Sequence, residues 1–228
     1  MATYNRYAQD DIVISTDRVS TSTWSNNTND LNVAHTSSTQ ASFGNATSSG
    51  AFRIDVFNLP TSSTSEEVQY AASYGNRRGS GSLDFTPLTG SKGLSATRDI
   101  YSQYRNLVFG TELTDFTFDT VTPDDIFVIN VERSRYKQNL KPGTLNLYLS
   151  SSTGELHLTD DSITKTGSAV ITNIGRQFNI VSGSNGVMSG SALGQTTQGS
   201  YGLFYPDAGI LLFNAAAVSH SIGIAIDR

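Results

Sequence analysis

Short apolar runs separated by turn residues repeat along the second half of the chain, and this repetition most constrains the fold. The runs cover residues 124–136, 145–150, 154–161, 168–173, 176–183, 202–205 and 209–214. Short strands that recur every eight to twelve residues or so are typical of an all-β sandwich or barrel. We therefore predict a mainly β fold, a β-sandwich or barrel-like arrangement of antiparallel sheets.

Further strands are predicted outside this series. Residues 51–59 alternate between apolar and polar side chains, and residues 66–75 form a second candidate, as half-buried strands do. Shorter candidates are residues 11–15 and 221–228. In 124–136 both alternating sets are largely apolar, which predicts a central strand covered on both faces. The glycine- and serine-rich residues 183–200 are expected to form an exposed loop.

One helix is predicted at residues 96–109, so the chain could also be classed α+β. Ser95 is the candidate N-cap and Gly110 the end signal. Its expected apolar stripe consists of Ile100, Tyr104, Leu107 and Val108. We expect residues 1–228 to form a single β-rich domain with a soft boundary near 110–125.

The segment Tyr201–Asn214 is among the most apolar of the chain and carries Pro206-Asp207 at its centre. Two short apolar arms around a turn predict a hairpin. We expect it to bury Phe204, Ile210, Leu212 and Phe213, each large side chain contributing about 1.5–3 kcal/mol.

Composition excludes several classes of protein. Because the 228 residues contain no cysteine, there is no disulfide framework, thiolate zinc site or cysteine nucleophile. The net charge of −5 argues against a general nucleic-acid binder, whose phosphate contacts need a basic face. The apolar runs are too short for a membrane span, and the polar N-terminal segment predicts no Sec signal. We expect synthesis in a host cytoplasm.

No residue pattern predicts catalysis or a cofactor. His35, His157 and His220 have no metal-spaced partners, and alternation with leucines points His157 toward solvent, away from a role with Asp160 and Asp161. Three Asp pairs could suggest glycosidase carboxylates or calcium ligands. They lie at strand or turn starts, where Asp commonly accepts backbone hydrogen bonds, and we favour that interpretation. We predict no catalytic, cofactor-binding or metal-binding residue, and no enzyme.

A basic cluster is the candidate protein interface. It consists of Arg133, Arg135, Tyr136, Lys137 and Lys141. Basic residues interleaved with an aromatic ring could suit a nucleic-acid groove. The acidic total argues against this, and lysine or arginine on a strand edge also guards against edge-to-edge pairing. We favour a guarded strand edge or a contact with another protein.

Eight blocks of the sequence resemble a group of virion structural proteins of T4-like tailed phages, notably those that infect cyanobacteria. The blocks are "RYAQDDIVIS", "VSTSTWSNNTNDL", "YGNRRGSGSLDFT", "IYSQYRNLVFG", "DDIFVINVERSRYKQNLKPGTLNL", "LTDDSITKTGSA", "GRQFNIVSG" and "YGLFYPDAGILLFN". The resemblance implies a particle component, in the tail or baseplate. Some relatives are longer and continue past residue 228, so a role carried by their C-terminal region is not expected to transfer. The abrupt end indicates either a domain of a longer protein or a terminal strand that pairs with a neighbour. The family brings no catalytic motif.

The leading hypothesis is a non-enzymatic structural subunit of a phage virion. Its expected partners are other virion proteins and copies of itself, with no nucleic acid and no membrane. The first alternative is a tail-fibre module that binds a receptor or a host surface glycan through Trp24, Tyr136 and Tyr148. A capsid decoration protein and, last, a polysaccharide depolymerase remain as further alternatives.

Overall fold

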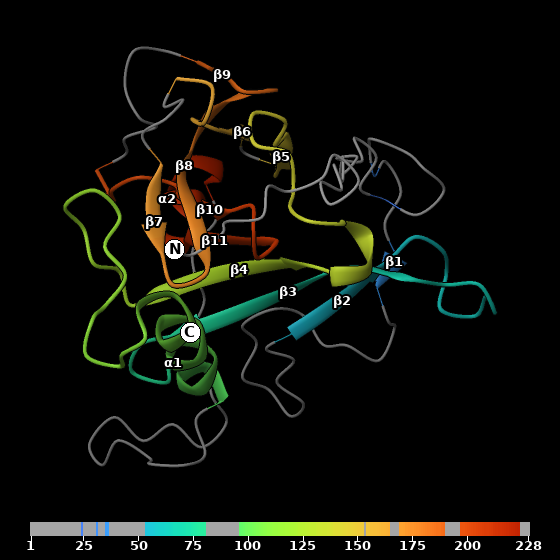
Figure 1. Cartoon of the computed structure of the whole chain (residues 1–228), viewed down its shortest axis with the longest axis horizontal. Coiled ribbons are helices and arrows are strands. Elements are labelled where there is room, and N and C mark those ends of the chain that lie inside the picture. Colours follow the sequence, from blue (N-terminus) through green and yellow to red (C-terminus); the bar gives the residue numbers. More distant parts are fainter. Residues whose placement is uncertain are drawn as a thin grey trace, which may run out of the picture.

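The described strands form one curled antiparallel sheet, so the predicted mainly β class is confirmed (Figure 1). The computed structural model describes residues 24, 31, 35–36, 53–80, 96–152, 154–164, 169–189 and 197–223. The strands are β1 His35–Thr36, β2 Arg53–Phe57, β3 Val68–Asn76, β4 Asp125–Val131, β5 Leu147–Ser150, β6 Glu155–Asp160, β7 Val170–Thr172, β8 Gly175–Ser184, β9 Val187–Met188, β10 Gly202–Tyr205 and β11 Ile210–Asn214. Their order is β1-β2-β3-β4-β11-β10-β8-β6-β5, with β7 and β9 paired to β8.

Strand β4 lies at the centre of the sheet, as its two apolar faces predicted. It pairs with β3 on one side and β11 on the other. Ile126 and Val128 face a core cluster that includes helix α1 (Ala96–Phe109), whereas Phe127 and Ile129 pack against the cluster that includes helix α2 (Ala215–Ile222). The two helices therefore cover opposite faces of the sheet.

Helix α1 is confirmed, but its buried stripe differs from the prediction. Leu107 is 44% exposed, whereas Tyr101 is fully buried. The buried positions are Thr97, Tyr101, Tyr104 and Val108, whose spacings of four, three and four keep them on one helical face. The hydroxyl of Tyr101 accepts a hydrogen bond from the Phe116 N–H at 3.3 Å. The candidate N-cap Ser95 lies outside the described residues.

Glycines set both the end of α1 and its distance from the sheet. Gly110 ends the helix at a φ of +70°, and its N–H donates to the Asn106 carbonyl at 2.8 Å. Beneath the helix, a Cβ on Gly75 of β3 would lie 3.0 Å from the Tyr101 nitrogen, so this position admits close packing only without a side chain. The following segment, 110–125, adds Phe116 and Phe118 to the same core.

The predicted core hairpin is confirmed as β10 and β11, which meet at Tyr205 and Ile210 around Pro206-Asp207. All nine strand residues are buried. Alternation along β10 sends Phe204 to the α2 face and Leu203 to the α1 face.

Three local predictions are wrong. Residues 221–222 belong to helix α2 and not to a strand, because Asn214 caps the helix start and Gly223 ends it in the left-handed conformation. Strand β4 stops at Val131, and a 3₁₀ turn, η2, follows at Arg133–Arg135. The expected loop 183–200 contains strand β9. The predicted strand 11–15 lies outside the described residues, as do 224–228.

Candidate functional site

The predicted basic interface is not a strand edge. Its residues lie in η2 and the loop after it, and β4 has strand partners on both sides. The guarded-edge interpretation is therefore wrong. Lys137 and Lys141 are exposed, and Arg135 donates to Glu67 Oε2 at 2.8 Å. The contact with another protein stays a prediction for these charged residues.

Tyr136 is part of the hydrophobic core. It is 8% exposed, and burial raises the pKa of its hydroxyl. The Arg133 guanidinium lies 4.7 Å from the ring centroid and donates to the Tyr136 carbonyl at 2.5 Å. On the other side, a Cβ on Gly209 would lie 2.6 Å from the ring, so the β10–β11 turn packs directly against it. Tyr136 therefore anchors the loop and is not available to a partner.

Of the three aromatic residues predicted to bind a glycan, only Tyr148 is exposed. Trp24 is partly buried against Tyr70, with ring centroids 5.9 Å apart, and Tyr136 belongs to the core. Tyr148 is 49% exposed and lies on β5, the last strand of the sheet. Tyr148 is thus the most exposed of the three aromatic side chains.

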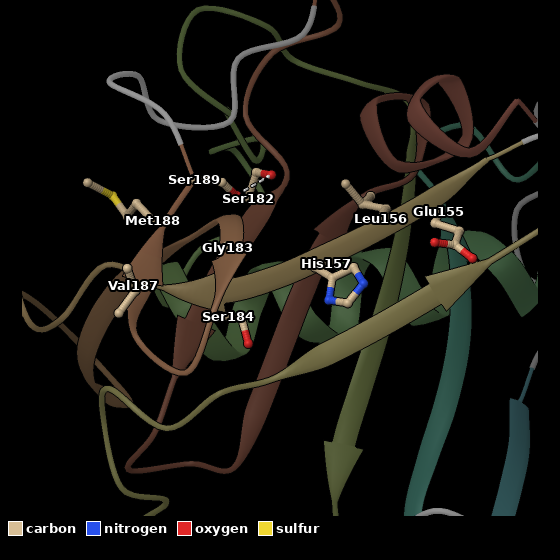
Figure 2. Close-up of a pocket in the computed structure, with 9 residues that line it drawn as sticks. All are labelled: Glu155, Leu156, His157, Ser182, Gly183, Ser184, Val187, Met188 and Ser189. Atoms are coloured by element: carbon tan, nitrogen blue, oxygen red, sulfur yellow. Dashed lines mark hydrogen bonds between the residues drawn. The ribbon is translucent and has the colours of Figure 1, made fainter.

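A shallow groove of about 500 Å³ lies beside β6, where β8 turns away from it. The β6–β8 ladder starts at Leu158 opposite Ser182, and beyond this pair β8 instead folds back onto β9. The lining residues are Glu155, Leu156, His157, Ser182, Gly183, Ser184, Val187, Met188 and Ser189. Figure 2 shows Glu155 and His157 on one strand, with the serines and Val187 across the gap.

The shape of the groove depends on Gly183. Extending the register by one position from Leu158 and Ser182 places Gly183 opposite His157. Gly183 has a φ of +152°, and a Cβ there would lie 2.1 Å from the Val187 carbonyl oxygen. Any other residue would strain this tight β8–β9 connection, and its side chain would have no room.

Hydrogen bonds hold the β8–β9 side of the groove. The Gly186 N–H donates to the Thr159 hydroxyl at 2.6 Å, and that hydroxyl donates to the Leu145 carbonyl at 2.6 Å. The Ser189 N–H donates to the Ser182 carbonyl at 2.8 Å. The groove wall is therefore tied to β6 and to the segment before β5.

Tyr148, His157 and Glu155 form a cluster, and two of its members, His157 and Glu155, line the groove. Tyr148 pairs directly with His157 across β5 and β6, and the two ring centroids lie 4.3 Å apart in an edge-to-face arrangement. Hydrogen bonding to the diagonal neighbour Glu155 raises the pKa of the Tyr148 hydroxyl. An exposed aromatic ring is thus held in place next to a carboxylate and an imidazole.

The paired aspartates accept hydrogen bonds, as the sequence predicted. Asp160 accepts the N–H groups of Gly143 and Leu145 at 2.7 and 3.2 Å. Asp161 accepts the Asn179 N–H at 2.9 Å and its side-chain amide at 2.7 Å. Both aspartates are buried while His157 is exposed, so the three do not form one site. Among the described residues no three His, Asp or Glu side chains gather as metal ligands do.

Asp124 of the second aspartate pair belongs to an ion-pair network that the sequence analysis missed, whereas Asp125 accepts hydrogen bonds from Tyr74 and Asn76. Arg77 donates to Asp124 at 2.6 Å and to Asp115 at 2.8 Å, and Arg105 of α1 also binds Asp115 at 2.7 Å. These contacts tie the end of β3 to α1 and to the segment before β4. No local spacing signals them, because the partners are far apart in the sequence.

Large apolar side chains are exposed on strand β7. Val170 and Ile171 are 56% and 73% exposed. Within the described part of the chain, β7 pairs with β8 alone, so its other edge has no strand partner there. An open edge that carries adjacent apolar side chains is a template for another chain.

No family model, curated protein sequence or solved structure matches this chain. Neither described helix has the length and apolar character that crossing a membrane requires.

Proposed function

We propose that this chain is a non-enzymatic structural component of a tailed-phage virion, in the tail or baseplate. In this role it assembles with copies of itself and with other virion proteins. The resemblance of its sequence blocks to virion structural proteins suggests the particle. The observation that carries the assembly role is the apolar edge of β7.

Two features of β7 support an assembly contact. Monomeric proteins usually guard an open strand edge with charge, proline or a covering loop. Strand β7 instead presents Val170 on one face and Ile171 on the other, both exposed. Pairing of another chain with this edge would extend the sheet and reduce the exposure of the two apolar side chains. The low content of charged residues, 15%, also reduces the desolvation cost of such contacts.

The assembly role is tested by comparing the mass of the purified protein with that of the Ile171→Lys variant. We expect light scattering to show an oligomer for the parent chain and a shift toward monomer for the variant, because a buried unpaired lysine is costly. Gln103→Lys, on an exposed position of α1, adds the same charge elsewhere and should leave the oligomer intact. A parent chain that is monomeric at the highest soluble concentration would refute self-assembly through β7.

The particle assignment needs a separate measurement. Mass spectrometry of purified virions should detect this chain, and an electron microscopy map should place it in the tail or baseplate. Its absence from intact particles would refute the virion role even if the protein forms oligomers.

A further inference from the structure

We propose that the groove between β6 and β9, together with the ring of Tyr148, is a binding site for a neutral saccharide. This groove is the surface formed by the nine lining residues given above. Its β8 residues are Ser182, Gly183 and Ser184, whereas β7 pairs with residues 175–177 near the other end of β8. The proposal does not rest on the assembly role, since it concerns different residues.

The shape of the groove suits a short saccharide. Its volume of about 500 Å³ falls in the range of small-ligand sites, roughly 300–1,000 Å³. It is open along one side, because the β6–β8 ladder does not continue past Leu158. An open groove admits an internal or terminal unit of a longer glycan, whereas a closed cavity would admit only a small molecule.

Tyr148 supplies an apolar platform beside His157, which lines the groove. A pyranose ring has a face of C–H groups that packs well on an aromatic ring, whose face carries the negative part of the quadrupole. Tyr148 is fixed on a strand, and its contact with His157 limits the freedom of the ring. Because this arrangement exists before binding, little conformational entropy is lost when a sugar packs against it.

The polar lining matches the hydroxyl groups of a sugar. Ser182, Ser184 and Ser189 each contribute a hydroxyl. Those of Ser182 and Ser189 share a hydrogen bond at 3.3 Å, and each oxygen keeps capacity to accept another. Ser184 donates to Asn146 Oδ1 at 3.1 Å and accepts from the Asn185 side-chain amide at 3.2 Å, so its oxygen keeps one further acceptor position. Glu155 adds a carboxylate, which accepts strong hydrogen bonds from sugar hydroxyls.

Charge selects neutral over acidic saccharides. Among the described residues that line the groove there is no lysine or arginine, and Glu155 contributes a carboxylate. A uronic acid, sialic acid or phosphate group would be repelled by this carboxylate and would find no cationic partner. The site should therefore prefer sugars without a negative charge.

The test uses the full chain on an array of neutral glucose-, galactose- and mannose-containing oligosaccharides, with uronic-acid and sialylated oligosaccharides printed beside them. We expect binding to one or more neutral compounds and none to the acidic ones. The best neutral compound is then titrated in solution, where it should shift the NMR signals of the Tyr148 and His157 rings.

Three variants tie the binding to the groove. Tyr148→Ala should weaken the affinity for the saccharide about tenfold or more. A tenfold loss corresponds to about 1.4 kcal/mol of binding free energy. Tyr148→Phe keeps the ring and should stay much closer to the parent affinity. Leu113→Ala removes another exposed apolar side chain, 93% exposed, and should not change binding. Thermal melting and light scattering check that the folding and oligomeric state of each variant are unaltered.

Two results would overturn the proposal: an array that is empty for neutral saccharides or positive only for acidic ones, and neutral binding that survives Tyr148→Ala. Neither result bears on the assembly role, because that role is read out by the mass of the Ile171→Lys variant.

Discussion

The carboxylate of Asp160 should contribute several kilocalories per mole to the free energy of unfolding. The variant Asp160→Asn, which replaces the carboxylate with an amide, measures this contribution. Asp160 ends β6 and is fully buried. Its two oxygens accept the N–H groups of Gly143 and Leu145, at 2.7 and 3.2 Å, and the hydroxyl of Ser162. These bonds fix the turn that leads into β5. In Asp160→Asn the shape is kept, but one acceptor oxygen becomes a donor.

The magnitude follows from the bonds that the amide cannot make. Its single oxygen can serve one of the two backbone N–H groups, while its NH₂ group faces the other donor. A hydrogen bond to a charged group contributes about 1.5–3 kcal/mol, and an unsatisfied buried donor costs about 1–3 kcal/mol. Because the two effects overlap, we expect Asp160→Asn to lower the free energy of unfolding by about 2–4 kcal/mol.

Urea denaturation followed by circular dichroism measures this change, with differential scanning calorimetry as a second reading. For a protein of this size, 2–4 kcal/mol corresponds to a fall in Tm of about 5–15 °C. Asp119→Asn makes the same chemical change on an exposed side chain and should stay within about 0.5 kcal/mol of the parent. If Asp160→Asn also stays within that margin, the carboxylate does not hold the turn and the argument fails.

Three further substitutions test the core, the hairpin turn and an ion pair. Leu212→Ala, at a fully buried position, should cost about 3–4 kcal/mol in urea denaturation, and a loss under 1 kcal/mol would contradict the packing. Gly209→Ala should cost about 2–4 kcal/mol by the same measurement, because φ is +68° and the new Cβ would press on the Tyr136 ring. Asp207 binds the side chain of Arg176 and its N–H, and hydrogen bonding to Arg176 lowers the pKa of the carboxyl below its ordinary 3.8. That stabilisation is complete above pH 3.8 and is lost as the pH falls through the lower folded value. Asp207→Asn should therefore cost about 1–2 kcal/mol at pH 7 and progressively less below pH 3.8, and a difference that stays constant down to pH 2 would count against the pair.

The strands that could be predicted are those whose side chains follow a local rule. Residues 145–150 alternate between half-buried leucines and exposed polar or aromatic side chains, as expected from one buried face. The doubly apolar pattern of 124–131 predicted a central strand, and β4 is central. The strand order could not be predicted, because nothing local indicates that β4 pairs with β11.

The errors came from signals given too little weight. Helix α2 begins after Asn214, runs through three alanines and ends at Gly223, which together are a strong helix pattern. On α1, we predicted that Leu107 would be buried and did not include Tyr101. The two residues lie on adjacent faces of the helix, and hydrophobicity alone does not decide which of these faces is buried. The first error concerns a helix defined by its capping residues, and the second concerns a buried face that is decided by packing against the sheet.

The groove was only partly visible in the sequence. Tyr148 was a candidate, and the exposure of His157 was predicted and confirmed. The opposite wall was missed, although Asn185-Gly186 is a strong hairpin signal, and the two residues have φ of 50° and 77°. That Gly183 lies opposite His157 depends on pairing between β6 and β8, which no local pattern specifies.

The pairing of Asn130 with Ile210 has a consequence for how the chain acquires its structure during synthesis. While the ribosome is still making the last hairpin, β4 has an unfilled side and its apolar faces are incompletely covered. Contacts of such high contact order form slowly and leave nascent chains open to aggregation. Completion of the sheet must therefore wait until β11 has left the exit tunnel and can pair with β4.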